Sequence, residues 1–284
     1  MQAEEAVQAQ EFDRWLGDPR EPLIMGVLNV TPDSFSDGGR YARADAAVAH
    51  AREMMAAGAA IIDIGGESTR PGSQRIDAAE QKRRILPVIQ ALRGAPCVIS
   101  VDTTLAEVAE AALAAGAYIV NDISAGRDDP AMLALVARLG VPVILMHMQG
   151  TPQTMQQAPF YQDVVREVGE FLRQRLAAAQ AAGVAAERVM LDPGIGFGKT
   201  LAHNLTLLRD LRTLAEIGRP LVLGTSRKSF IGQITGEIDP AQRLMGTAAS
   251  VAWCVAHGAA IVRVHDVGPM AQVVRVIRAI QRGA

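Results

Sequence analysis

The sequence predicts a single (β/α)8 barrel, and three observations support this prediction. Short apolar runs alternate with alanine-rich helical patterns from residue 23 to the end of the 284-residue chain. The runs are almost continuously apolar, which is typical of parallel strands that are buried on both faces. The joints between helical and apolar stretches also repeat almost unchanged. About eight such units follow one another, which favours a closed barrel.

The expected strands begin with the run LIMGVLNV, and good helix formers fill the stretches between them. The first three helical patterns are RADAAVAHAREMMAAG, DAAEQKRRILPVIQAL and TLAEVAEAALAAG. We expect strands over residues 23–30, 60–64, 97–101, 118–122, 142–147, 188–191, 220–223 and 260–264.

Glycine marks the joints at which a helix ends and a strand begins. In AAGAAIIDI, AAGAYIVND and AHGAAIVRV, the glycines Gly58, Gly116 and Gly258 can take the left-handed conformation that ends a helix. RLGVPVILM and EIGRPLVLG use Gly140 and Gly218 in the same way, and a proline follows each. The repeated joint therefore indicates repeated αβ units.

The N-terminal residues lie outside the repeated pattern. Residues 1–20, MQAEEAVQAQEFDRWLGDPR, contain no apolar segment of the kind found in signal peptides, so we expect a helical or frayed extension. No linker or change in composition marks a further domain. We therefore expect an extension over residues 1–20 and one barrel domain over residues 21–284.

Composition and charge narrow the class of protein. Hydrophobic residues make up 49% of the chain and charged residues 20%, which suits a well-packed core. A net charge of -2 gives no support to nucleic-acid binding. No stretch approaches the ~20 apolar residues of a membrane span. Cys97 and Cys254 lie in apolar runs without CxxC spacing, so we expect reduced thiols in a cytoplasmic protein.

The alternative fold is an open doubly wound sheet, but its nucleotide-binding loops are missing. DPGIGFGKT resembles a phosphate-binding loop, yet that pattern needs glycine where Pro193 stands. The dinucleotide pattern G-x-G-x-x-G fails as well, because Lys199 occupies its last position. Both nucleotide-loop interpretations are excluded by spacing.

Polar residues gather where the expected strands end, which is the end of a barrel that carries chemistry. Barrel closure alone does not require this pattern. The strand ends carry Asn29, Asp63, Asp102, Asn121 with Asp122, Met146 with His147, Asp192, Ser226 to Ser229, and Arg263 with His265.

Structural roles remain open for three of these residues. Asp102 could be the N-cap of the next helix, and Asp63 could brace a neighbouring loop. His147 lies among methionines in LMHMQG, where a structural histidine is favoured over a metal ligand. No HExxH motif and no His/Cys cluster appears, so a tightly bound zinc ion is not expected.

The remaining side chains describe a pocket for a flat, polar heterocycle. Asp102, Asn121 and Asp192 offer acceptors to an edge of N–H donors, and such charge-assisted hydrogen bonds contribute about 1.5–3 kcal/mol each. Lys228 adds a donor, and Arg263 can stack on a flat ring. Met146 and Phe197 could form apolar walls.

A second set of residues suits an anion near the join of the last strand and the first. Asn29, Arg263 and His265 would face phosphate oxygens there. An amide oxygen together with phosphate oxygens and waters is a usual environment for Mg²⁺. We therefore expect Mg²⁺ at Asn29.

At this point the sequence resembles a known family. GVLNVTPDSFSDGG, DIGGESTRPG, SVDTT, NDIS, LMHMQGTPQTMQ, LDPGIGFGKT, SRKSFIG and RVHDV are similar to the successive motifs of bacterial dihydropteroate synthases. They run in order from about residue 24 to 268, one at almost every strand end. The ordered set is highly specific, whereas one such motif would be weak evidence.

The resemblance implies a homodimeric (β/α)8 barrel of folate biosynthesis. It implies that 6-hydroxymethyl-7,8-dihydropterin pyrophosphate and 4-aminobenzoate give 7,8-dihydropteroate and pyrophosphate, with sulfonamides as competitive inhibitors. The pterin would lie against Asp102, Asn121, Asp192 and Lys228, under Arg263, with Met146 and Phe197 beside it. Asn29, Arg263 and His265 would hold the pyrophosphate, with Asn29 also on Mg²⁺.

The resemblance also assigns the two loops that follow the first two strands. Residues 31–39 and the segment GESTRPG would close over the bound pterin and form the second-substrate site. Phe35, Thr69 and Pro71 would flank the aminobenzoate ring, and Lys228 and Ser229 would meet its carboxylate at a helix start. Asp37 and Arg70 would help order the closed loops. Apart from the resemblance, the last helical patterns, residues 242–257 and 269–282, are candidate dimer surfaces.

Two other functions remain as alternatives. A pterin-binding methyltransferase barrel would share the pterin acceptors but would not need TPDSFSDGG or SRKS. A catalytically silent pterin-binding protein would have no use for a leaving-group site at Asn29, Arg263 and His265. The synthase interpretation is favoured over both.

Overall fold

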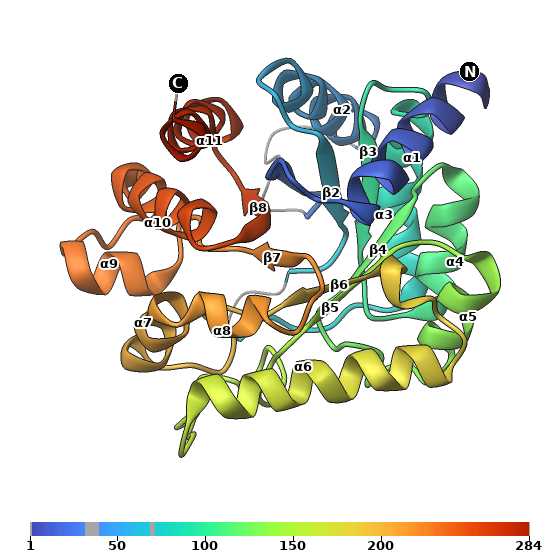
Figure 1. Ribbon diagram of the computed structural model, residues 1–284. Helices are drawn as coiled ribbons and strands as arrows, with labels where there is room; N and C mark the ends of the chain where they lie inside the picture. Colours follow the sequence, from blue (N-terminus) through green and yellow to red (C-terminus); the bar gives the residue numbers. More distant parts are fainter. Residues whose placement is uncertain (1, 32–39, 69–71, 284) are drawn as a thin grey trace.

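The computed structural model describes residues 2–31, 40–68 and 72–283, and these form one closed barrel of eight parallel strands (Figure 1). Neighbouring strands pair in sequence order, and β8 pairs with β1 to close the ring. The strands are β1 (Leu23–Asn29), β2 (Ile61–Gly65), β3 (Val98–Asp102), β4 (Ile119–Asp122), β5 (Val143–Met146), β6 (Val189–Asp192), β7 (Leu221–Leu223) and β8 (Ala259–Val264). The predicted (β/α)8, or TIM, barrel is confirmed.

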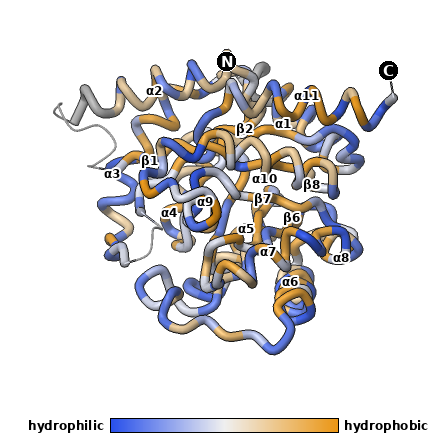
Figure 2. The backbone as a smooth tube through the Cα atoms, turned by 90° about the vertical axis from the view of Figure 1, so that its left-hand side faces the viewer, coloured by the Kyte–Doolittle hydropathy of each residue, from blue (hydrophilic) through white to orange (hydrophobic). Residues whose placement is uncertain are grey.

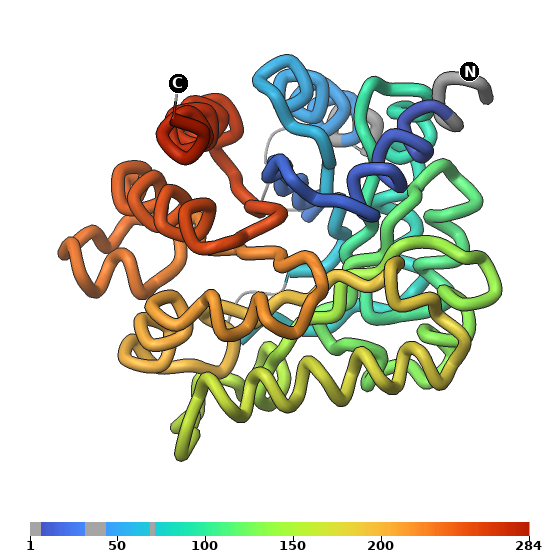
Figure 3. Tube along the Cα trace, viewed as in Figure 1, coloured from blue at the N-terminus to red at the C-terminus, as the bar shows by residue number. Residues whose placement is uncertain are grey.

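Helices surround the barrel and cover the outer face of the strands, in chain order around the ring (Figure 3). In Figure 2 the strands run in hydrophobic colours through the middle, and the helices alternate between hydrophobic and hydrophilic residues. The α-helices are α1 (Gln2–Gly17), α2 (Arg40–Ala56), α3 (Ala78–Ala91), α4 (Ala106–Ala115), α5 (Ala131–Leu139), α6 (Val164–Ala181), α7 (Leu201–Arg209), α8 (Leu211–Ala215), α9 (Ser229–Thr235), α10 (Leu244–Ala256) and α11 (Val267–Arg282). The described residues also include the short 3₁₀ turns η2 (Ala186–Arg188) and η3 (Pro240–Gln242).

The predicted glycine joints are present in the structure. The φ angles of Gly58, Gly116 and Gly258 are 107°, 124° and 100°, and those of Gly140 and Gly218 are 65° and 81°. A side chain is strained at such angles, which explains why glycine recurs at these helix ends.

All eight strands differ from the sequence prediction by one residue at one or both ends, and three of these shifts have a clear local reason. β5 and β7 begin one residue after Pro142 and Pro220, because proline has no N–H to donate to the sheet. β6 begins after Arg188, because that residue belongs to η2. The topology is unaffected.

Helix α1 covers the end of the barrel at which the strands begin. Phe12 and Leu16 pack with the first inward-facing residues of the strands. Asp13 fastens the helix through an ion pair with Arg188 and a 2.7 Å hydrogen bond donated by the Tyr118 hydroxyl. The cluster at this end consists of Phe12, Leu16, Met25, Ile61, Val98, Ile119, Ile144, Met190, Val222 and Ile261.

Candidate active site

The polar residues of the barrel interior form the layer above this apolar cluster. Side chains alternate along a strand, so a residue two positions beyond an inward-facing residue also faces inward. Two positions beyond Ile61, Val98, Ile119, Ile144, Met190 and Ile261 stand Asp63, Ser100, Asn121, Met146, Asp192 and Arg263. The closed topology thus brings the predicted strand-end residues together in one place.

Arg263 is the centre of a charged network in this layer. Its Nε donates to Asp63 Oδ2 at 2.6 Å, and its Nη2 donates to Asp102 Oδ2 at 2.8 Å. Asn121 Nδ2 also donates to Asp63 Oδ2, at 3.0 Å. Asp63 is fully buried, and its Oδ1 has no partner among the described residues. Asp63 therefore orients two residues of the predicted pterin pocket rather than bracing a loop.

Asp102 faces the Arg263 network, and it does not cap the next helix. Helix α4 has Leu105 at its N-cap, and the backbone N–H of Ala106 is bound by Asp129 Oδ2 at 2.8 Å. Burial raises the pKa of Asp102 to about 7, and the charge of Asp63 adds to this, while Arg263 opposes it. A carboxylate in this setting gains stability from any donor that reaches it.

Asp192 ends β6 and faces the same layer. Its Oδ1 accepts a 2.7 Å hydrogen bond from the backbone N–H of Gly194, which fixes the carboxylate at the start of the next loop. Burial raises the pKa of Asp192 to about 6, and the charges of Lys228 and Arg263 limit this rise. Two carboxylates and one amide therefore converge as a set that seeks hydrogen-bond donors.

Apolar side chains form a wall beside this set. Met146 and Phe197 belong to one buried cluster with Ile123, Met148 and Met155. Lys228 Nζ lies 3.9 Å from the centre of the Phe197 ring, a cation–π contact. Burial and the nearby Arg263 charge lower the pKa of Lys228 to about 8. The predicted walls and the predicted lysine therefore meet at one side of the pocket.

The predicted anion-binding residues lie at the ends of β1 and β8. A Cβ atom built on Gly65 would lie 3.8 Å from Asn29 Oδ1 and 3.7 Å from Asp102 Oδ2, so these two oxygens flank Gly65. His265 Nδ1 lies 3.0 Å from Ser226 Oγ, which also accepts from the His265 backbone N–H at 3.2 Å. Burial lowers the pKa of His265 to about 3, so the ring is neutral near pH 7.

Within the described ranges, no group of three or more His, Cys, Asp and Glu side chains could hold a metal ion. Asn29 supplies one amide oxygen at the edge of the pocket. Mg²⁺ is often bound by few protein ligands together with substrate phosphates and waters. This donor set fits a Mg²⁺ ion that arrives with a pyrophosphate, and it does not fit a protein-only cage.

The base of the second predicted loop is anchored by several polar contacts near the pocket. Glu67 accepts from the Ile76 backbone N–H at 3.1 Å, and burial raises its pKa. Arg75 forms an ion pair with Asp128, and the Gly72 N–H donates to Pro152 O at 3.0 Å.

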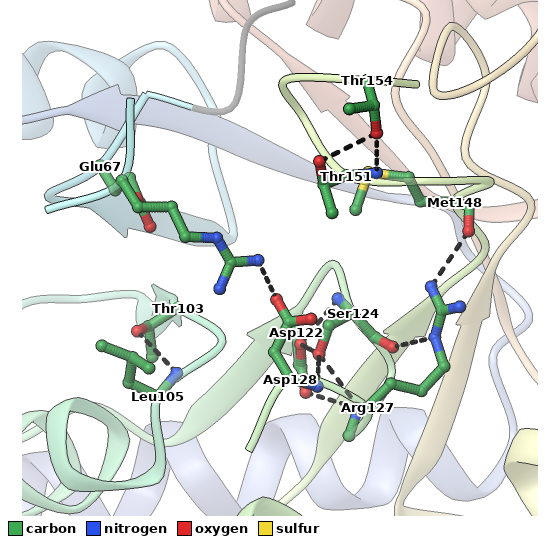
Figure 4. Close-up of polar contacts among 12 residues, drawn as sticks. Glu67, Thr103, Leu105, Asp122, Ser124, Arg127, Asp128, Met148, Thr151 and Thr154 are labelled. Atoms are coloured by element: carbon green, nitrogen blue, oxygen red, sulfur yellow. Dashed lines mark hydrogen bonds and ion pairs between the residues drawn. The ribbon is translucent and has the colours of Figure 1, made fainter. Parts of the chain in front are cut away.

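Asp128 belongs to a loop that is itself tightly held (Figure 4). Asp122 Oδ1 accepts from the Ser124 hydroxyl at 2.7 Å, and Ser124 Oγ accepts from the Asp128 N–H at 3.2 Å. Arg127 Nη2 donates to Met148 O at 3.0 Å. Gly72 and Arg75, on the C-terminal side of the second loop, are therefore bound to the loops that follow β5 and β4.

Five predicted residues lie outside the described ranges: Phe35, Asp37, Thr69, Arg70 and Pro71. Ser229 is exposed at the first position of α9, next to Lys228. Their predicted roles with the second substrate stay predictions.

Several residues have structural roles. His147 is buried and hydrogen-bonded to Lys199, as its apolar sequence context favours. Cys97 and Cys254 are buried free thiols, as their apolar sequence context favours. Sequence reasoning assigned no site role to Asp63 or Lys199, although a charged residue inside an apolar run was a signal for Asp63. In residues 2–31, 40–68 and 72–283, no helix has the length and apolarity that a bilayer crossing requires.

Comparison with known proteins agrees with this geometry. The family described as pterin binding enzyme matches residues 25–265. A dihydropteroate synthase of Synechocystis sp. is 50% identical over 264 residues, which cover 93% of this chain and 91% of the relative. The dihydropteroate synthase of Escherichia coli is 46% identical over 263 residues, or 92% and 93% of the two chains.

Comparison with solved structures also finds dihydropteroate synthases. A Xanthomonas albilineans dihydropteroate synthase with 4-aminobenzoic acid has a TM-score of 0.89 and 46% identity, covering 94% of this chain and 95% of that one. A Yersinia pestis dihydropteroate synthase with a sulfonamide drug complex has a TM-score of 0.88 and 43% identity, covering 94% and 96%. The chain therefore belongs to the dihydropteroate synthase family of pterin-binding enzymes.

Proposed function

We propose that the residues of the barrel mouth carry out the family's reaction at the positions described above. As a dihydropteroate synthase, the chain is a transferase of folate synthesis. It joins 6-hydroxymethyl-7,8-dihydropterin pyrophosphate to 4-aminobenzoate and releases pyrophosphate. The proposal concerns which side chains perform each part of this substitution.

The pterin ring binds across the donor-seeking set. Its amino and ring N–H groups donate to Asp102 and Asp192, and Asn121 completes the edge. Because both carboxylates are buried and have raised pKa values, each new donor relieves a desolvation cost. Lys228 donates to the ring carbonyl side, and the guanidinium of Arg263 stacks on the ring while Asp63 holds it.

The reaction is a substitution at the pterin methylene carbon. The C–O bond to pyrophosphate breaks, and its electron pair leaves with the pyrophosphate. The positive charge that develops on the pterin faces Asp102 and Asp192. The aminobenzoate nitrogen then bonds to the methylene carbon and loses one proton to solvent. Arg263 and the neutral ring of His265 donate hydrogen bonds to the departing oxygens.

Mg²⁺ is the metal we propose for this site, with Asn29 as its protein ligand. When bound, it neutralises charge on the pyrophosphate. The supporting observation is the donor set: an amide oxygen at the pocket edge and no protein cage in the described ranges. Asn29 would also orient the pyrophosphate through its amide N–H.

The second substrate, 4-aminobenzoate, would approach from the side of Lys228 and Ser229. Its carboxylate suits the lysine and the free N–H groups at the start of α9. Sulfonamides, which resemble 4-aminobenzoate in shape, would compete with it at this subsite. The Yersinia pestis relative with its sulfonamide drug supports this proposal.

The observation that carries the proposal is the convergence of Asp102, Asn121, Asp192 and Arg263 toward the carboxyl ends of the barrel strands. The test is product formation from the two substrates, with Mg²⁺ and with EDTA. We expect dihydropteroate and pyrophosphate only when the metal is present. Asp192→Ala should lose pterin binding in calorimetric titration, and unchanged affinity would refute the pocket assignment. Pterin binding by the wild-type chain without product would favour the methyltransferase or silent-binder alternative.

We further propose a homodimer that forms through α9, α10 and α11, which lie side by side in Figure 1. Large apolar side chains are exposed on this face, including Ile238 at 90% and Met245 at 79%. Patches of this kind commonly mark subunit interfaces. Met245→Glu should give a monomer in analytical ultracentrifugation, whereas Phe160→Glu, exposed on the loop between β5 and α6, should not.

A further inference from the structure

Lys199 is a buried lysine that the proposed reaction does not use. Its side chain is 3% exposed. Its amine bonds to His147 Nδ1 at 2.9 Å, Gly194 O at 2.9 Å and Phe197 O at 3.0 Å. No carboxylate of the described residues hydrogen-bonds to it. Burying an amine without a directly bound counter-charge costs folding free energy, so the burial of Lys199 calls for an explanation.

The three contacts satisfy a lysine completely. An ammonium group has three N–H donors and no acceptor. Two contacts are carbonyl oxygens, and the third is a ring nitrogen of His147. Burial lowers the pKa of His147 to about 2, so its ring is neutral. Nδ1 then accepts from Lys199, and the ring proton lies on Nε2. Burial also lowers the pKa of Lys199 to about 7.

The loop after β6 contains three glycines, and the backbone conformation they adopt needs contacts that hold it. Gly194, Gly196 and Gly198 have φ angles of 67°, 82° and 62°. Glycines at these angles give an untied loop many other conformations. The loop also packs tightly, since a Cβ atom on Gly194 would lie 1.9 Å from His147 O. The observed, closely packed conformation is only one of those open to the glycines, so it needs contacts that stabilise it.

Two bonds from Lys199 lead to a side chain of the proposed pterin pocket, and the third leads to the backbone of Asp192. Gly194, whose carbonyl it binds, donates its N–H to Asp192 Oδ1 at 2.7 Å. Phe197, whose carbonyl it also binds, places its ring 3.9 Å from Lys228 Nζ. The backbone N–H of His147 donates to Asp192 O at 2.9 Å. One buried amine thus connects to the carboxylate, the aromatic wall and the strand that carries Asp192.

We propose that Lys199 is a positioning residue of the pterin pocket, whose buried amine ties the glycine-rich loop 193–198 into the conformation that aims the Asp192 carboxylate and the Phe197 ring at the pterin. The proposal rests on the proposed function for the identity of the ligand. Lys199 itself touches neither substrate nor the reacting atoms.

The test is Lys199→Met in the full chain, which keeps the length and apolar stem of the side chain but removes the amine. We expect the calorimetric Kd for 6-hydroxymethyl-7,8-dihydropterin pyrophosphate to rise at least about tenfold, because small displacements of a binding group are costly. The KM for 4-aminobenzoate at saturating pterin should change little. A fall in activity and unfolding midpoint with an unchanged pterin Kd would overturn the proposal.

Two further sets of variants serve as controls for this test. Lys82→Met removes a surface lysine that pairs with Glu107, and it should leave the pterin Kd unchanged. If Lys199→Met does not fold, His147→Leu replaces it and should weaken pterin binding. His147→Asn should restore binding, since its side-chain oxygen can accept from Lys199. Equal pterin affinity of the Leu and Asn variants would also contradict the proposal. Absence of pterin binding by the wild-type chain would instead refute the proposed function.

Discussion

Arg263 and Asp63 are joined by a 2.6 Å hydrogen bond from Nε to Oδ2, although 200 residues separate them in the chain. They stand on β8 and β2, the two strands that flank β1. The same Asp63 oxygen accepts from Asn121 on β4. A carboxylate that binds no substrate in our proposal therefore sets the direction of two side chains that do.

Asp63→Ala should damage both stability and pterin binding. Removing one member of a buried ion pair leaves the other uncompensated, which typically costs about 3–5 kcal/mol of unfolding free energy. Arg263 would keep only Asp102, so we also expect a higher pterin Kd. Urea unfolding and calorimetry measure the two effects. Ser100→Ala is the matched control, because its buried hydroxyl has no partner in the described ranges. Equal effects of both variants would argue against a specific role for Asp63.

Asp192→Asn should stabilise the fold at alkaline pH while it removes pterin binding. The folded pKa of Asp192, about 6, lies above its ordinary value of 3.8 because the group is buried. The folded state therefore binds this proton more tightly than the unfolded state. Stability from this group is full below pH 3.8 and is lost as the pH rises through about 6. The loss is on the order of 3 kcal/mol for a shift of about two units.

The measurement is urea unfolding of both proteins at pH 4 and pH 8. Relative to wild type, Asp192→Asn should gain stability between these two values. Asp210→Asn serves as the control, because hydrogen bonds from Arg209 lower the pKa of Asp210. A lowered pKa gives a contribution that is lost as the pH falls, so this control should not reproduce the gain. Parallel pH dependence of wild type and Asp192→Asn would contradict the assignment.

Ser226→Ala should slow the reaction more than it weakens pterin binding. Ser226 Oγ lies 3.0 Å from His265 Nδ1 and fixes the ring that would donate to the leaving pyrophosphate. We expect kcat to fall several-fold, within the range that a lost neutral hydrogen bond of about 1 kcal/mol allows. Steady-state kinetics measure this. Ser250→Ala, which loses a 2.9 Å bond to Thr225 instead, is the neighbouring control. Comparable kcat values for both variants would refute the proposed role of Ser226 in positioning the His265 ring.

Much of the fold and part of the site could be predicted from sequence for one reason: the chain repeats a simple unit. Gly58, Gly116 and Gly258 ended helices where expected, and strand-end residues such as Asp102 and Asp192 met because parallel strands share one end. The pairings inside the barrel could not be predicted. Whether Asp63 reaches Arg263 depends on the inward direction of both side chains and on the closure of the sheet.

Lys199 shows the same limit more sharply. In the sequence analysis, Lys199 served only to exclude a dinucleotide-binding loop, because it stands where that pattern needs glycine. Its partners are two backbone carbonyls and a ring nitrogen, and none of these leaves a residue-specific signature in the glycine-rich loop. Contacts to backbone atoms therefore hid a residue whose role is visible only in the fold.

Phe12→Ala should destabilise the protein without changing its kinetics. Phe12 is 4% exposed and packs from α1 into the closed end of the barrel, in edge contact with Tyr118. Truncation of a buried phenylalanine typically costs about 3–5 kcal/mol. The pocket residues lie in the layers beyond this cluster, so kcat and both KM values should remain those of the wild type. Val7→Ala, at a half-exposed position of the same helix, should change the unfolding free energy by at most about 0.5 kcal/mol. Thermal unfolding and steady-state kinetics measure both variants, and a changed pterin KM in Phe12→Ala would mean that α1 also shapes the pocket.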